Sequence, residues 1–297
     1  MVLIVKTLIK DIEQLKPLFM RTLLVFFSLL LTVTLAKAQA NFQGKAVYMS
    51  KTTMDMNFGS RQMSEDQKKR IAERMKSFLE KTYTLNFNKI ASTYKEEEKL
   101  GAPDQGRRGR FGGMMSSFSG GLKYKNTKDA VVLEETEFFG KKFLIADEGK
   151  KPLWLLSGET KKIGNYICYK ATLEKEVSAF SFSSFRRRGR SNNGNTTKKK
   201  EEEKPKMMTV VAWYTPQIPV SQGPGEFWGL PGLILEINSG RTTVLCTSIT
   251  LNPKEKIEIK KPKKGKKVSR DEYTKIVKKK MEEMREQFRG RGGRRRG

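Results

Sequence analysis

Apolar and polar residues alternate along most of the middle of the chain, and this pattern predicts a β-rich protein. Runs with a period of two are typical of strands that bury one face, and here Gly-rich or charged turns separate them. Their spacing favours an antiparallel meander over βαβ units. The predicted strands are 41–57, 83–95, 130–137, 142–147, 153–157, 166–174, 207–214, 233–237 and 241–251, with 255–260 extending the last one.

Two segments instead have the periodicity of an amphipathic helix. Ser64 and Gln67 form a capping box that predicts a helix to about Lys81. Ser269 begins a second predicted helix, to about Phe288, with an acidic first turn. The expected fold is therefore a β-rich α+β class: a curved antiparallel meander sheet, half-barrel or bowl-like, with two amphipathic helices. Their apolar stripes are Ile71, Met75, Phe78 and Leu79, and Tyr273, Ile276, Val277, Met281, Met284 and Phe288.

The first 38 residues are typical of an export signal. Arg21 precedes an apolar run over residues 23–35, and Ala36-Lys37-Ala38 has the form of a cleavage site. The run is shorter than the roughly 20 residues that span a bilayer. We expect residues 1–38 to be a signal peptide, with Met20 as an alternative start, and a single mature domain over 39–288. No cysteine follows the cleavage site, so the protein is expected to be exported without being a lipoprotein.

Charge changes this picture, because 60 Lys and Arg against 32 Asp and Glu give a net charge of +28. Arg-Gly tracts that contain phenylalanine occupy about 101–121 and 183–206 and the tail 289–297. Such composition predicts disorder and resembles RGG segments that bind polyanions. A solvated basic surface that keeps the protein soluble is the other interpretation. The candidate contacts are Arg107, Arg108, Arg110, Arg186, Arg187, Arg188, Arg190, Arg294, Arg295 and Arg296.

The residue inventory limits the chemistry. The chain has no histidine, which excludes His-based triads, His general bases and His metal ligands. Cys168 and Cys246 are too few for a Cys-rich zinc site. They pair across neighbouring strands in an oxidising compartment, or else they are small buried thiols, which we favour. No phosphate loop or nucleophile elbow is present, so we expect no enzymatic activity, no metal and no cofactor.

A Pro-Gly turn within residues 225–237 is the most distinctive local feature. Leu230-Pro231-Gly232-Leu233 fits a type II turn with positive φ at Gly232. The large aromatic residues near it are either the wall of a concavity that binds an apolar or peptide-like ligand, or core residues, which we favour. These residues are Trp154, Trp213, Tyr214, Phe227 and Trp228.

These residues also carry a family resemblance. Gly229-Leu230-Pro231-Gly232-Leu233-Ile234 is identical to the motif that names the GLPGLI family. Further features in the same order are residues 162–172, then Ala212-Trp213-Tyr214-Thr215, Ile218-Pro219 and Gly223-Pro224. The resemblance runs from about residue 41 to about residue 260. It implies an exported Bacteroidetes-type envelope protein without known activity, similar to accessories of outer-membrane transport or surface systems.

The resulting expectation is a non-enzymatic binding or accessory module of the periplasm or outer membrane, with an envelope protein as its partner. The alternative is a nucleic-acid or other polyanion-binding protein that acts through the Arg-Gly tracts. Export argues against nucleic acid, because an exported protein rarely meets RNA. In that case the tracts are expected to contact lipopolysaccharide or anionic lipid head groups.

Overall fold

The computed structural model describes residues 26, 42–53, 64–97, 121–176 and 207–292. The chain forms two units, Met1–Gln43 and Gly44–Gly297, and the architecture below belongs to the second. The predicted signal peptide apart from Phe26, most of the Arg-Gly tracts and residues 293–297 lie outside the described residues. Residues 289–292, predicted as the start of a disordered tail, are helical instead.

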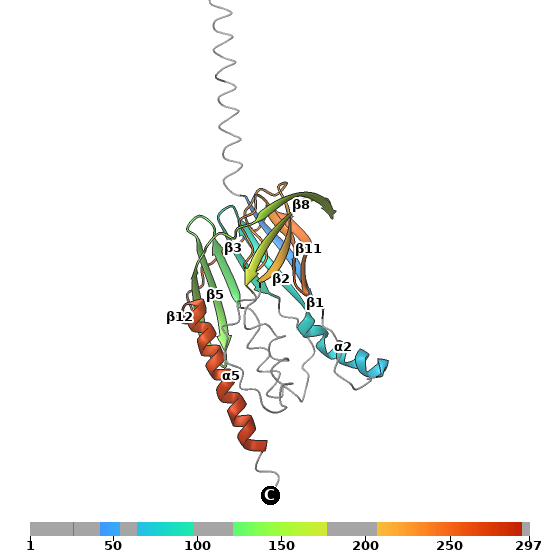
Figure 1. Cartoon of the computed structure of the whole chain (residues 1–297). Coiled ribbons are helices and arrows are strands. Elements are labelled where there is room, and N and C mark those ends of the chain that lie inside the picture. Colours follow the sequence, from blue (N-terminus) through green and yellow to red (C-terminus); the bar gives the residue numbers. More distant parts are fainter. Residues whose placement is uncertain (1–25, 27–41, 54–63, 98–120, 177–206, 293–297) are drawn as a thin grey trace, which may run out of the picture. The chain divides into compact units, whose positions relative to one another are not determined.

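Twelve strands form one open sheet, which confirms the predicted β-rich class (Figure 1). Its order is β12-β6-β5-β4-β3-β2-β1-β11-β10-β9-β8-β7. The bounds are β1 Gln43–Thr52, β2 Glu80–Asn88, β3 Ala91–Glu96, β4 Leu122–Asn126, β5 Val131–Phe138, β6 Lys141–Glu148, β7 Leu155–Ile163, β8 Tyr166–Glu176, β9 Met207–Thr215, β10 Leu233–Ser239, β11 Thr242–Leu251 and β12 Lys266–Val268.

The sheet consists of two meanders, β1 to β6 and β7 to β11, joined by antiparallel pairing of β1 with β11. The three-residue β12 adds to β6 in parallel, so the sheet is mixed rather than purely antiparallel. Residues 255–260 do not extend the last hairpin as predicted, because β11 ends at Leu251.

A short connection shows that the sheet is strongly curved. β6 and β7 stand second and last in the strand order, so a flat sheet would separate them by about 48 Å. Only residues 149–154 join them, and such a link spans at most about 24 Å. The two sides of the sheet must therefore bend toward each other, as predicted for a half-barrel.

The two predicted helices are present. Helix α2, Glu65–Leu79, begins with the predicted capping box: the Ser64 hydroxyl accepts from the Gln67 amide at 3.3 Å, and the Gln67 side chain accepts from the Ser64 amide at 3.4 Å. It ends two residues before the predicted Lys81, because β2 begins at Glu80. Side chains Ile71, Met75 and Phe78 lie outside the described ones.

Helix α5, Arg270–Gly292, covers the strands at the opposite edge of the sheet from β7. Its apolar stripe packs on β5, β6 and β12, as predicted, and extends four residues beyond the predicted end. The buried contacts are Val277 and Met281 with Phe138, Phe143, Ile145 and Val268.

The three longest insertions, between β1 and β2, β3 and β4, and β8 and β9, attach at one end of the sheet, which we call the insertion end. Antiparallel pairing places the ends of β3 and β8 and the starts of β4 and β9 there. Lys51 lies against Glu80, and Gly44 lies against Phe87, so β1 and β2 also run antiparallel and α2 is inserted at this same end. The β5–β6 hairpin, Phe139-Gly140, is there too.

The cysteines are free thiols on strands that are not neighbours. Cys168 lies on β8 and Cys246 on β11, with β9 and β10 between them. The free thiols agree with the favoured interpretation, although only Cys168 is fully buried. The alternative, a pairing across neighbouring strands, is wrong, since three strand spacings are about 14 Å along the sheet. A disulfide needs Cα atoms within about 7 Å. Burial raises the pKa of Cys168 to about 11 and that of Cys246 to about 12.

We therefore expect the protein to keep both thiols reduced and unreactive in the native state. Ellman's reagent at neutral pH should react slowly with the folded protein, because raised pKa values leave little thiolate. After unfolding in denaturant, both thiols should react. Mass spectrometry under non-reducing conditions serves as the control, and an intramolecular disulfide would contradict the observed strand order.

Candidate functional site

The connection between β9 and β10, residues 216–232, is folded against the inner face of the curved sheet, and we call it the plug. Buried side chains along it are Ile218, Val220, Gln222, Trp228 and Leu230. Its backbone is tied to β10 through Leu233 to Ile218 at 3.0 Å and Ile234 to Gln222 at 3.1 Å. The plug therefore fills the interior with the protein's own chain.

Lys125 on β4 anchors the plug from the opposite side of the sheet. Its side chain is 1% exposed, and its amine donates to the carbonyls of Gly223 at 2.6 Å and Phe227 at 3.1 Å. The pKa of Lys125 is lowered from 10.5 to about 7, chiefly by burial and also by the positive charge of Lys123, while Glu226 partly opposes the shift. The amine is thus close to half-protonated at neutral pH and still satisfies two buried carbonyls.

Two further side chains tie distant strands to the same region. Ser92 on β3 donates to the Gln222 side-chain oxygen at 2.7 Å, and Tyr48 on β1 donates to the Ile234 carbonyl at 2.7 Å. Burial raises the pKa of Tyr48 well above its ordinary value, so the phenol remains a neutral donor. These bonds hold β1, β3 and β4 against the plug and β10.

The predicted aromatic wall does not form one surface. Trp213 and Tyr214 are neighbours on β9, so they point to opposite faces. Tyr214 is buried in a core cluster with Leu230 and Ile234, whereas Trp213 lies under the Lys161 ammonium, 4.4 Å from its ring centroid.

The other aromatic residues pack around the plug. The Trp154 indole donates to the Trp228 carbonyl at 2.8 Å, and its ring lies 6.2 Å from that of Phe227. Trp228 is 6% exposed. Leu233 and Ile234 of the motif are fully buried. This packing favours the core interpretation of the motif.

The turn at the motif differs from the predicted type II. Gly232 is not among the residues with positive φ, and its amide bonds to the Leu230 carbonyl at 2.9 Å, the pattern of a three-residue turn around exposed Pro231. Gly229, with φ of 92°, has the left-handed conformation instead. Gly232 is needed for space, because a Cβ there would lie 2.2 Å from the Thr215 carbonyl oxygen.

Charged side chains surround the plug as ion pairs. Lys175 contacts Glu226 at 2.5 Å, and Arg270 contacts both Glu134 at 2.8 Å and Asp147 at 3.0 Å. Burial opposes ionisation of Glu226, but Lys175 and Lys123 outweigh it and lower its pKa. Each of these carboxylates is the partner of a cation, which gives no support to an acid–base pair.

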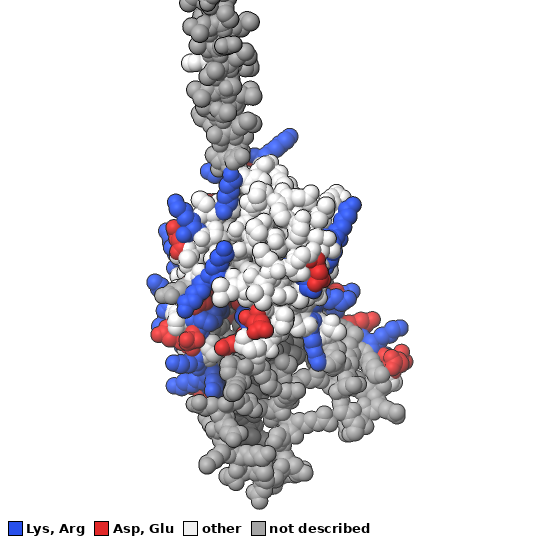
Figure 2. Space-filling view, turned by 45° about the horizontal axis from the view of Figure 1, so that its top comes forward, with Lys and Arg blue, Asp and Glu red and all other residues white. Residues whose placement is uncertain are grey.

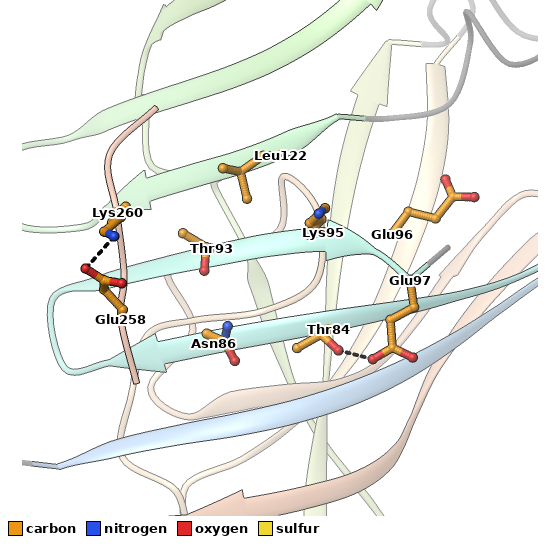
Figure 3. A pocket seen from close by; sticks show the side chains of 9 residues that line it. All are labelled: Thr84, Asn86, Thr93, Lys95, Glu96, Glu97, Leu122, Glu258 and Lys260. Atoms are coloured by element: carbon orange, nitrogen blue, oxygen red, sulfur yellow. Dashed lines mark hydrogen bonds and ion pairs between the residues drawn. The ribbon is translucent and has the colours of Figure 1, made fainter. Parts of the chain in front are cut away.

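A second feature is a polar groove on the outer face of β2, β3 and β4 (Figure 3). Its volume is about 620 Å³, and Thr93 faces it while its neighbour Ser92 faces the plug. Residues 255–260 cross this face, with Lys260 paired to Glu258 at 2.7 Å. The groove is lined by Thr84, Asn86, Thr93, Lys95, Glu96, Glu97, Leu122, Glu258 and Lys260.

Sequence reasoning missed both the plug and the groove. The alternation over 83–95 did mark the polar side chains of the groove floor, but only the strand register shows which of them share a face. Within the described residues, no group of three or more acidic or cysteine side chains is arranged to hold a metal ion, and no helix is long and apolar enough to cross a membrane. The ten predicted arginine contacts lie outside the described residues.

Replacing Gly232 with alanine should destabilise the protein by about 3 kcal/mol, because the added methyl meets backbone that cannot move aside. The matched control is Gly158→Ala, where a Cβ meets nothing within 4 Å. That variant should stay within about 0.5 kcal/mol of the wild type. Urea unfolding measures both, and equal stability of the two variants would contradict the close approach at Thr215.

Lys125→Met should change how stability depends on pH. The pKa of Lys125 is lower in the folded state, so the unfolded state binds more protons between about pH 7 and 10.5. The stability of the wild type should therefore rise with pH across this window relative to the variant, and the relative gain should vanish below pH 7. Loss of the two donated bonds should cost the variant about 2 kcal/mol at the alkaline end.

Lys128→Met, an exposed lysine in the β4–β5 turn, is the control and should follow the wild type. Urea unfolding across the pH range is the measurement. A pH profile of Lys125→Met parallel to that of the wild type would show that the buried amine does not titrate in this window.

Comparison with known proteins adds a family and a distant structural likeness. Two solved structures of PNGF-II, in space groups C2 and P21, are similar to this chain at 14% sequence identity, with TM-scores of 0.44 and 0.45. The matches cover 80% and 79% of this chain, which spans only 32% and 33% of theirs. No curated protein matches the chain. Residues 154–236, which include β7 to β9 and the plug, match the family described as "Protein of unknown function (Porph_ging)".

Proposed function

We propose that the protein is a non-enzymatic, exported envelope module of the GLPGLI type that binds an anionic surface or partner at the insertion end of its sheet. The observation that carries the proposal is topological. The chain leaves the sheet after Glu97 and Glu176 and returns before Leu122 and Met207, all at the insertion end. The two internal Arg-Gly tracts are thus attached to one end of one folded frame.

The filled interior supports binding at the surface. Tyr214 of β9 and Leu230 of the plug belong to one buried core cluster, and Trp228 of the plug is buried as well, so these side chains do not line an open cavity. The groove on the outer face is lined almost entirely by polar and charged side chains, and Leu122 is its single apolar lining residue. These surfaces therefore favour a partner that is recognised by its charge over a ligand that binds in an apolar cavity.

Attachment at one end makes the charges act together. Lys and Arg within a Debye length, about 8 Å at physiological salt, add their attraction for an anionic surface. Each basic residue near such a surface contributes about 1 kcal/mol. The predicted arginine contacts Arg107, Arg186 and their neighbours belong to tracts with this shared attachment. Lipopolysaccharide and anionic lipid head groups have the matching charge, and an envelope transport protein is the remaining partner class.

The motif supports the GLPGLI assignment. Residues 229–234 are identical to the naming motif and lie within the matched segment 154–236. The structure gives the motif a physical role, since Gly229, Gly232 and Leu230 form the part of the plug that enters β10.

Nucleic-acid binding is the second candidate function, and the Arg-Gly-Phe composition of the tracts favours it. Arginine with aromatic side chains combines phosphate neutralisation with base stacking. The compartment of the protein separates the two candidates, because an exported chain meets lipid and lipopolysaccharide phosphates rather than RNA.

Cell fractionation with N-terminal sequencing tests the proposal. The expected species is periplasmic or bound to the outer membrane and begins at Gln39. Ala38→Phe should accumulate as an unprocessed form, because the cleavage position needs a small residue. An intact cytoplasmic chain that keeps residues 20–38 would overturn the envelope assignment and leave nucleic acid as the function to pursue.

A further inference from the structure

The β5–β6 hairpin has an unusual tip. Phe138 pairs with Lys141, so Phe139 and Gly140 form a two-residue loop, and both have positive φ, 49° and 74°. This turn strongly prefers Asn-Gly, because a bulky side chain at positive φ is strained. Phe139 nevertheless occupies the position and is 38% exposed. A strained conformation at an exposed aromatic residue indicates a function for that residue.

Lysines from two separate parts of the chain surround this tip. Lys141 and Lys142 begin β6, and the parallel pairing of Lys266 with Phe143 brings residues 263–264 beside them. A Cβ at Gly265 would lie 2.9 Å from the Lys142 carbonyl carbon, so the two backbones touch. We call this set the hairpin patch: Phe139, Lys141, Lys142, Lys263, Lys264 and Lys266.

The charge of the hairpin patch is largely uncompensated. All five lysines are exposed, and none has an ion pair with a described residue. Glu137, opposite Lys142, is the one acidic residue in direct register with them. Ion pairs of described lysines lie in other parts of the chain, such as Lys161 with Glu236 and Lys175 with Glu226. Figure 2 shows one face of the molecule, with an uncharged area bordered by Lys and Arg, several of them beside acidic residues.

We propose that the hairpin patch is a contact site for an anionic lipid bilayer, separate from the Arg-Gly tracts. Phe139 enters the interface between head groups and acyl chains, and the five lysines lie over the lipid phosphates. Lysine suits this role because it is a point charge on a flexible stem, whereas recognition of bases and planar anions favours arginine. The proposal rests on the proposed envelope function, since that location supplies the bilayer.

The geometry favours a bilayer over a nucleic acid. A convex tip that ends in one aromatic residue can enter a lipid interface, but base stacking needs a platform with several rings in a groove. The bilayer contact would explain why a strained Phe139 occupies the turn. Asparagine would relieve the strain at this position, but it would offer no apolar surface to the bilayer. The patch also lies at the insertion end, where the basic tracts attach, so both face the same surface.

The test is co-sedimentation of the full mature chain with phosphatidylglycerol vesicles, and with phosphatidylcholine vesicles for comparison. Lys263→Gln combined with Lys264→Gln should lower partitioning into the anionic vesicles roughly ten- to thirtyfold, from about fivefold per lysine. The matched control changes two exposed lysines in turns at the other end of the sheet, Lys89→Gln with Lys128→Gln. That control should lower partitioning less than threefold, roughly the screened long-range effect.

Phe139→Asn separates insertion from misfolding. Asparagine tolerates positive φ, and this relief offsets the lost edge-on contact of the Phe139 ring with Phe138, 4.7 Å between centroids. The variant should therefore stay within about 1 kcal/mol of the wild type in urea and still bind vesicles several-fold more weakly. Its control is Ile90→Asn, another exposed apolar residue, in the β2–β3 turn at the other end. That variant should bind like the wild type.

Three results would overturn the inference: unchanged vesicle binding by the double lysine variant, unchanged binding by Phe139→Asn, or equal losses in the patch variants and their controls. Duplex DNA is a parallel probe, and a larger loss for DNA than for vesicles would also overturn it. The proposed function fails separately, since it depends on processing and location in the cell. Binding that persists in the patch variants and disappears without the tracts would leave the proposed function intact.

Discussion

The structure depends on a buried amine that joins two sides of one sheet. Lys125 on β4 donates to two carbonyls of the plug, which grows from β9 and β10. These strands are five or more positions from β4 in the strand order, so no ladder hydrogen bond connects them. The plug bridges this distance, and its buried Trp228 and Leu230 each contribute about 1.5–3 kcal/mol of burial. Without it, an open curved sheet would leave an apolar inner face exposed to water.

Burying an irregular segment is possible only if its polar backbone is satisfied. The plug meets this requirement in two ways. Its amides and carbonyls bond within the plug and to β10, as for Gly229 to Ser221 at 3.2 Å. Four of its residues are prolines, and Pro224, the buried one among them, lacks an amide that would otherwise need a partner. Proline here is a means of burying a loop as well as a means of turning it.

The sequence predicted local structure well because local chemistry determines it. The capping box at Ser64 specifies a helix start, and alternation specifies strands, so the class and most strand bounds after residue 130 followed. The predicted strand 83–95 is wrong, because it is a hairpin of two strands, β2 and β3. Successive residues of a strand point to opposite faces, so the sequence alone already argues that Trp213 and Tyr214 do not line the same wall. The sequence analysis did not predict the short strand β4. It also missed three long-range features: the parallel addition of β12, the plug and the partners of Lys125. The sequence likewise does not show whether a glycine is needed for a positive φ or because a side chain would not fit. At Gly232 the reason is the lack of room for a Cβ.

A filled interior and a functional end follow from the same architecture. Because the plug, Lys125 and Tyr48 fix both halves of the sheet, strand ends far apart in sequence keep constant positions. Weak contacts carried on one rigid frame bind together with a high effective concentration, so their energies add without further ordering cost. Phe139 and the lysines beside it need such a frame, because a strained tip persists only where the surrounding strands determine its conformation. The stability of the core and the exposure of the hairpin tip are therefore linked: the pairing of β5 with β6, supported by α5 on their inner face, holds Phe139 outside it.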